Sequence, residues 1–169
     1  MISQTFSSYD LEQLSQVAAE DSRRRKNFNL HADFEDPVQY FVNRIFSDSY
    51  IRPHRHDLNS GVEILVALSG VSVAVIFNDN GNIESCVFLE SPGISSRKDM
   101  NAVVTLAPMT WHTVIALDGN VTLLEIKKGP FNPLAAKQFA EWAPEEGSER
   151  ALDYLRDLVD EVKAVRLGL

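Results

Sequence analysis

Three histidines occupy positions typical of a metal site. His54 and His56 are separated by one residue, and His112 follows much later in the chain. Because side chains alternate across an extended strand, His54 and His56 should point to the same side of a sheet. Neutral imidazole is the commonest protein ligand for borderline transition metals. A third histidine on a later strand therefore predicts a site for one divalent transition metal ion, with Fe, Mn, Ni and Zn all open as its identity.

One carboxylate stands in an apolar stretch shortly after the histidine pair. Glu63 is the only charged residue of segment 62–68. Burying an unpaired charge costs several kcal/mol, so Glu63 should have a cation or hydrogen-bond donors beside it. We weigh two alternatives, a fourth metal ligand and an ion pair with Arg52. Glu125 alternates onto the inward face of its predicted strand and is a reserve candidate for fourth ligand or general base, so Glu63 and Glu125 are the candidate catalytic residues.

Other side chains near the histidines are candidates for substrate binding. If residues 50–56 are extended, Arg52 shares a face with both histidines, and its guanidinium suits a carboxylate or phosphate of a ligand. The alternative is that Arg52 only neutralises Glu63. Three aromatic residues can form cavity walls suited to a sugar ring, or can equally belong to the core: Tyr50, Trp111 and Phe131.

Length, composition and charge narrow the class of protein. A chain of 169 residues that is 44% hydrophobic is long enough for one domain with a well-buried core. Its formal net charge of −8 opposes binding to nucleic acid. No stretch approaches the roughly 18 consecutive apolar residues of a membrane span, and the first residues lack the layout of a secretory signal. We expect a cytoplasmic protein, in agreement with a single cysteine, Cys86, which we assign to the core.

From about Phe34 onward, short apolar runs broken by turn residues predict an all-β sandwich or barrel. Residues 78–81 and 118–120 can supply the positive φ angles of hairpin turns, and strands linked so tightly should pair antiparallel. Segment 62–68 is apolar on both faces apart from Glu63, so a helix or a second subunit should cover its outer side. The clearest strands span residues 62–68, 71–77, 83–89, 102–107, 112–117 and 121–127.

Helices are predicted at both ends of the chain. Residues 9–24 show helical spacing with Asp10 as a candidate N-cap, and residues 149–167 do so with Ser148 as a candidate N-cap. The second helix carries an apolar stripe that must be covered, formed by Leu152, Leu155, Val159 and Val162. The chain then divides into a helical lead-in (1–24), a β-barrel (25–132) and a helical extension (133–169).

Several segments resemble a known family. His54-x-His56, then Glu63 with Gly70 seven positions on, and later Pro108 before His112 resemble the two sequence motifs of the cupin superfamily. A closer similarity, over about residues 22–132, is to the WbuC-type cupin-fold metalloproteins. The segments that carry it are Arg23-Arg24-Arg25, Asn27-x-Asn29-Leu30-His31, Asp36-Pro37-Val38-Gln39, the run from Tyr50 to His56, and the run from Glu125 to Phe131.

The resemblance implies a mainly β protein with a cupin barrel, a double-stranded β-helix or jelly roll, flanked by helices. It also implies a metal in the barrel mouth, held by the residues matching His54, His56 and His112, with Glu63 as a further candidate. Such families commonly occur near bacterial surface-polysaccharide pathways. Asn29 and His31 lie in the family-like lead-in, where they either line the cavity as substrate-binding donors or form a hydrogen-bonded turn.

Two features depart from the family pattern. Six residues separate His56 from Glu63, more than the usual cupin spacing, so residues 57–62 should form a bulged loop that can pull Glu63 away from the ion. The second motif lacks its usual glycine, with Thr110 in that region. Both departures concern the number of metal ligands, and neither removes the three histidines.

These observations favour a metal-dependent enzyme acting on a small polar molecule, such as a sugar or sugar acid. Isomerisation, epimerisation or lyase chemistry would use Glu63 or Glu125 to move a proton, and iron(II) would instead support oxygenation. One alternative is a non-catalytic small-molecule-binding or sensory protein in which the ion and Arg52 fix an anion. Another is a structural role in an assembly. The partners we expect are an anionic or carbohydrate small molecule and a second copy of the chain in a homodimer, without nucleic acid or membrane.

Overall fold

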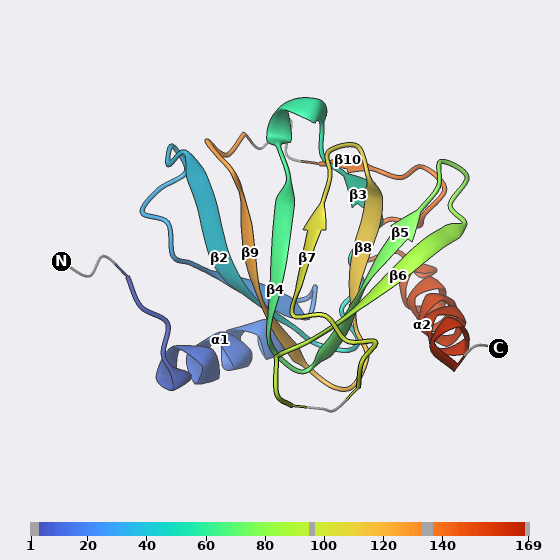
Figure 1. Ribbon diagram of the computed structural model, residues 1–169, viewed down its shortest axis with the longest axis horizontal. Coiled ribbons are helices and arrows are strands. Elements are labelled where there is room, and N and C mark those ends of the chain that lie inside the picture. Colours follow the sequence, from blue (N-terminus) through green and yellow to red (C-terminus); the bar gives the residue numbers. More distant parts are fainter. Residues whose placement is uncertain (1–3, 95–96, 133–136, 168–169) are drawn as a thin grey trace.

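Two five-stranded antiparallel sheets form the centre of the molecule. The computed structural model describes residues 4–94, 97–132 and 137–167 (Figure 1). The first sheet has the order β1 (Arg25–Asn29), β2 (Val38–Ile45), β9 (Val121–Lys128), β4 (Glu63–Ser69) and β7 (Val103–Leu106). The second has the order β10 (Gln138–Phe139), β3 (His54–Arg55), β8 (Trp111–Ala116), β5 (Val71–Phe77) and β6 (Ile83–Glu90). The all-β prediction is confirmed.

The two predicted hairpin turns have different outcomes. Residues 78–81 do join β5 to the antiparallel β6, with Gly81 at φ 86° and its N–H donating to the Asn78 carbonyl. Residues 118–120 instead carry the chain from β8 in one sheet to β9 in the other, so the expected pairing of these two strands is wrong. Gly70 makes a similar crossing between β4 and β5. A Cβ atom on Gly70 would lie 2.6 Å from the Asn120 carbonyl oxygen, so the two crossings can pack together only because Gly70 has no side chain.

Helix α1 (Ser8–Glu20) packs on β1 and β2 of the first sheet. Its N-cap is Ser7, and Asp10 is the third helical residue of a capping box, so the predicted cap at Asp10 is wrong by three positions. The helix also ends earlier than predicted. Asp21 already has the extended ψ of 133° and ends the helix, Arg24 has a left-handed φ of 57°, and β1 starts at the next residue.

Helix α2 (Ala151–Leu167) packs on the outer side of the second sheet, and Figure 1 shows it on the opposite side of the molecule from α1. It starts two residues later than predicted. Leu152 is 52% exposed and does not belong to the buried stripe, contrary to the prediction. The residues that α2 buries are Ala151, Leu155, Leu158 and Val162. They pack against β5, β6 and β8 of the same chain, so the stripe is covered without a second subunit.

A second apolar cluster fills one half of the space between the sheets. We call it the apolar half of the barrel; it consists of Ile45, Leu65, Ala67, Leu89, Leu106, Val114, Ala116, Val121 and Leu123. Several of these side chains are almost fully inaccessible to solvent, as expected for a closely packed interior. The other half of the same space contains the predicted functional residues.

Candidate metal centre and adjoining cavity

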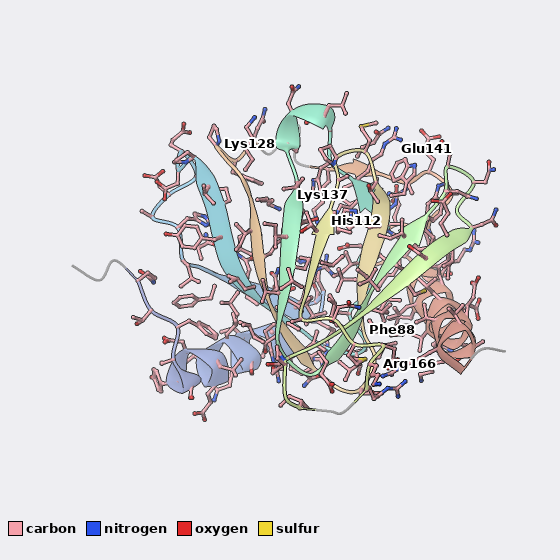
Figure 2. The ribbon with its side chains drawn as sticks, in the orientation of Figure 1. Phe88, His112, Lys128, Lys137, Glu141 and Arg166 are labelled. Atoms are coloured by element: carbon pink, nitrogen blue, oxygen red, sulfur yellow. The ribbon has the colours of Figure 1, made fainter. Side chains whose placement is uncertain are left out.

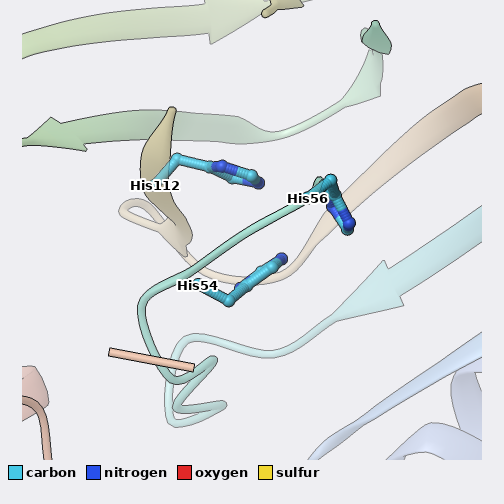
Figure 3. A group of neighbouring side chains, drawn as sticks. All are labelled: His54, His56 and His112. Atoms are coloured by element: carbon cyan, nitrogen blue, oxygen red, sulfur yellow. The ribbon is translucent and has the colours of Figure 1, made fainter. Parts of the chain in front are cut away.

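The three histidines come together at one end of the second sheet, as expected from the sequence. His54 in β3 lies directly opposite His112 in β8, and His56 follows β3 immediately. One ring nitrogen from each lies within 4.8 Å of the others, and Figure 3 shows the rings turned toward one another. All three side chains are buried. Among the residues that the structure describes, this is the group whose geometry can hold a metal ion.

Backbone carbonyl groups fix the tautomer of two of these rings. Nδ1 of His54 lies 2.9 Å from the Arg52 carbonyl oxygen, and Nδ1 of His112 lies 2.9 Å from that of Thr110. A carbonyl can only accept a hydrogen bond, so each Nδ1 carries the proton and each neutral ring has its lone pair on Nε2. Metal-binding histidines are commonly oriented in this way. Burial, and then the positive charge of Lys137, lower the pKa of His54 well below its ordinary range, so this ring stays neutral.

Glu63 completes the group. Its Oε2 atom lies 3.0 Å from Nε2 of His112 and 3.3 Å from Nε2 of His56. Burial alone raises the pKa of Glu63, but the contacts with His112 and His56 outweigh burial and hold the pKa well below its ordinary range.

A neutral His112 carries its proton on Nδ1, so its Nε2 has no proton to donate to the carboxylate of Glu63. A cation shared between the imidazole lone pairs and the carboxylate oxygen removes that conflict, so the three histidines and Glu63 fit a divalent transition metal ion.

The loop between His56 and Glu63 does not pull Glu63 away from the histidines. Residues Leu58–Ser60 form a short 3₁₀ turn, in which the N–H groups of Asn59 and Ser60 donate to the side chain of Asp57. Glu63 is then the first residue of β4, and its side chain points inward. The six-residue loop is therefore accommodated as a bulge at the rim.

Arg52 lies outside the site, and its predicted place beside the histidines is wrong. Its guanidinium donates to the Ala140 carbonyl from Nε at 3.2 Å and from Nη2 at 2.8 Å, and it stacks over the Phe139 ring. The predicted ion pair with Glu63 does not form. Alternation of side chains holds only within a strand, and β3 is just two residues long, so the pattern does not extend back to Arg52.

Tyr50 and Trp111 belong to the core beneath α2, which is the alternative that the sequence left open. The Tyr50 hydroxyl donates to the Pro144 carbonyl, and its ring packs edge-on against Tyr154. Nε1 of Trp111 donates to Asp79 at 2.9 Å. Neither residue lines the cavity beside the histidines.

A cavity of about 390 Å³ adjoins the metal centre. His54, His112 and Glu63 form one part of its wall, and the apolar half of the barrel forms its floor through Leu65, Val114 and Leu123. Three residues predicted as candidates for substrate binding or cavity walls line it: Asn29, His31 and Phe131. Its volume is within the range of small-molecule sites.

Glu125 also lines this cavity, next to Glu63. Its Oε1 atom lies 2.7 Å from Nζ of Lys127, and its Oε2 atom accepts a hydrogen bond from the Asn43 side chain at 2.8 Å. Burial, and then the negative charge of Glu63, raise the pKa of Glu125. A carboxyl group held in this way, close to a metal site, can accept or release a proton.

Two lysines that the sequence did not single out also line the cavity, Lys127 and Lys137. Lys127 follows Glu125 by two positions in β9, so the alternation that places Glu125 inward also places Lys127 inward. No comparable signal exists for Lys137. It lies just before β10, which is too short to show a periodic pattern.

No helix among the described residues is long and apolar enough to cross a membrane.

The fold is that of known cupins. A cupin-like protein of Thermotoga maritima aligns over 78% of this chain and 82% of its own, with a TM-score of 0.50 and 14% identity. A protein of Shewanella oneidensis aligns over 68% of this chain and 72% of its own, with a TM-score of 0.52 and 8% identity. A cupin 2 conserved barrel domain protein of Rhodopseudomonas palustris gives a TM-score of 0.49 at 14% identity, over 81% and 77% of the two chains.

Comparisons of the sequence identify no family of known function. A family model described as a domain of unknown function, DUF6016, matches residues 6–89. No curated protein matches the sequence. The architecture is therefore a cupin barrel with flanking helices, and its three buried histidines can bind a metal ion.

Proposed function

We propose that this protein is a metal-dependent enzyme that acts on a small polar molecule. The observation that carries the proposal is the convergence of three buried imidazoles and Glu63 on one point beside a cavity. Iron, manganese, nickel and zinc all suit such nitrogen and oxygen ligands. When bound, the ion would polarise a carbonyl or hydroxyl group of the ligand.

The chain's own residues supply the proton transfer. Glu63 contacts two of the histidines and acts as the fourth ligand, which leaves Glu125 to move the proton. Lys127 and Asn43 hold the two oxygens of Glu125 in place, so its carboxyl group is positioned before a ligand arrives. Isomerisation or epimerisation is the reaction class that this arrangement suits best.

Two narrower assignments accompany this proposal. We infer membership of the WbuC-type cupins from the segments that resemble them, and with it a sugar or sugar-acid substrate related to surface polysaccharides. An oxygenase is the alternative reaction if the ion is iron(II), because its open positions would then bind dioxygen. A non-catalytic ligand-binding or sensory protein is the alternative without turnover.

Deuterium exchange tests for proton transfer. Protein loaded with Mn²⁺ would be incubated in D₂O with a panel of sugar acids and small organic acids, and each compound would be analysed by mass spectrometry. We expect deuterium to enter a ligand at carbon, and Glu125→Gln to abolish this exchange while retaining the metal. Binding without exchange by any compound, and without oxygen consumption by the iron form, would favour the sensory alternative.

We also propose a homodimer, in which the outer side of β4 and β7 contacts a second copy. Leu68 in β4 and Val103 in β7 are 41% and 49% exposed, although both are apolar. Helix α1 packs on β1 and β2, and α2 packs on the second sheet, so each helix lies on other strands. Light scattering should give the mass of two chains for the wild type and of one chain for Val103→Asp. Leu152→Asp, on the exposed side of α2, is the control, and an unchanged mass for Val103→Asp would contradict the proposal.

A further inference from the structure

We propose that the ligand of this cavity is an organic anion, whose anionic group binds Lys137 and one of whose oxygens forms a hydrogen bond with Nε2 of His31. This inference narrows the substrate class of the proposed function and rests on it for the role of the metal centre. Lys137 and His31 line the cavity and take the ligand-binding role predicted for Arg52, which lies outside the cavity.

The basic side chains around the cavity differ in whether they are already paired. Arg23 and Lys26 contact Asp21, Arg25 contacts Glu146, and Lys127 contacts Glu125. Lys137 is the remaining basic residue of the lining. Within the described part of the chain, no carboxylate forms an ion pair with it. An ammonium group on the wall of a cavity in a protein of net charge −8 is a binding site for a small anion.

The position of Lys137 follows from the pairing of β10 with β3. Phe139 lies directly opposite His54 in this pair, and Gln138 opposite Arg55. Lys137 directly precedes β10 and lines the same cavity as His54 and His112. Its side chain is exposed, which places it at the cavity mouth, and Figure 2 shows it in the same part of the barrel as His112. The anion would therefore bind close to the metal centre.

His31 provides a second, independent indication of a ligand. Its side chain is 6% exposed, and Nε2 is buried without a hydrogen-bond partner among the described residues. Nδ1 lies 3.0 Å from the Tyr40 carbonyl oxygen and 3.2 Å from the Tyr40 backbone nitrogen, so the Tyr40 backbone is its partner in either tautomer. A buried Nε2 on a cavity wall needs a hydrogen-bond partner, and a carboxylate or hydroxyl oxygen of a ligand supplies one.

Part of the remaining lining is aromatic or apolar and fits the body of the ligand, beside the polar side chains of Asn27, Asn29, Gln39 and Asn43. The rings of Phe34 and Phe131 lie 5.2 Å apart between centroids, and His31 lies 6.1 Å from Phe34. The floor is formed by side chains of the apolar half of the barrel. The apolar surface of a carboxylate-bearing ligand would be buried against these side chains, and its other polar groups have amide partners on the same wall.

Calorimetric binding of phenylacetate and glucuronate to the Zn²⁺-loaded full chain tests the inference, with phenylacetamide as the uncharged analogue. We expect phenylacetate to bind about tenfold or more tightly than phenylacetamide. Lys137→Met should weaken phenylacetate about tenfold or more and leave phenylacetamide unchanged. Lys163→Met, which removes one charge from the exposed side of α2, should have no effect on either. His31→Phe should weaken binding of phenylacetate, and His31→Gln, which keeps a hydrogen-bonding side chain, should restore part of the loss.

The zinc content of every sample separates this inference from the proposed function. If the wild type holds no metal, the proposed function fails. If it holds metal but benzoate, hexanoate, phenylacetate and glucuronate all fail to bind, the inference fails. Equal binding of phenylacetate by Lys137→Met and the wild type would remove Lys137 from the site.

Discussion

The two halves of the barrel interior are built by the same strands and have opposite chemistry. In β4, Glu63 faces the metal centre, and Leu65, two residues on, faces the apolar half. In β8, His112 is followed in the same way by Val114. On the inward face of each strand, a candidate metal ligand is therefore followed two residues later by a buried apolar side chain. The apolar half stabilises the fold and allows the other half to bury charges that are unfavourable without an ion or ligand.

The largest effect on stability should come from the apolar half. Leu123 is 1% exposed, and Leu123→Ala would remove buried methyl groups and leave a cavity. We expect the free energy of unfolding to fall by about 2–5 kcal/mol in chemical denaturation, while the saturating metal content is unchanged. Leu152→Ala, at an exposed position of α2, should change stability by less than about 0.5 kcal/mol. A Leu123→Ala variant as stable as the wild type would contradict the assignment of this cluster as the core.

We call the half of the barrel that contains the three histidines, Glu63 and Glu125 the polar half. Substitutions in it should change the affinity for metal. Glu63→Gln removes a negative charge from between His56 and His112. We expect the affinity for Zn²⁺ to fall about 10- to 100-fold, measured by competition with a chelating dye. Glu125→Gln is the matched control and should retain metal affinity within about threefold, since the contacts with His56 and His112 come from Glu63, while Glu125 is held by Lys127 and Asn43. A larger loss for Glu125→Gln than for Glu63→Gln would reverse the two roles.

The polar half should also make the metal-free protein sensitive to acid. The pKa of His54 in the folded protein is lower than its ordinary value of 6.5, chiefly because of burial. Below about pH 6.5 the unfolded chain takes up a proton that the folded protein does not, so stability is lost as the pH falls. The lowered pKa of Glu63 acts in the same direction below its ordinary value of 4.5.

Urea denaturation of the metal-free protein at several pH values between 7.5 and 5.5 measures this effect. We expect the contribution of His54 to approach about 1.4 kcal/mol per pH unit at most. His54→Gln should have a smaller slope, and an equal slope in both proteins would show that His54 does not remain neutral on folding.

The elements that the sequence predicted well are those with clear turns at both ends. The bounds of β5, residues 71–77, agree with the prediction because Gly70 and the turn at 78–81 delimit it. The strands β1 and β2 were not among the predicted ones, because cavity-lining polar residues such as Asn27 and Asn43 obscure their alternation. The sheet to which β9 belongs depends on its distant partners β2 and β4, which local sequence does not specify.

Within the site, the prediction from residue type agrees with the structure, whereas the prediction that extended side-chain alternation beyond a short strand does not. The three histidines were found because ligands need particular residue types, and β3 and β8 then place His54 opposite His112. Arg52 was misplaced because alternation was extended past the end of a short strand. Lys137 was not found because its position depends on the pairing of β10 with β3, more than 80 residues away in the sequence.

The metal content of untagged protein, purified without chelators and measured by mass spectrometry, tests the central claim most directly. We predict about one transition metal ion per wild-type chain and less than about a tenth of this in His54→Ala/His56→Ala. His31→Ala, which removes the fourth histidine but none of the proposed ligands, should keep the wild-type content. Wild-type metal content in the double variant, with its fold intact by circular dichroism, would contradict the account.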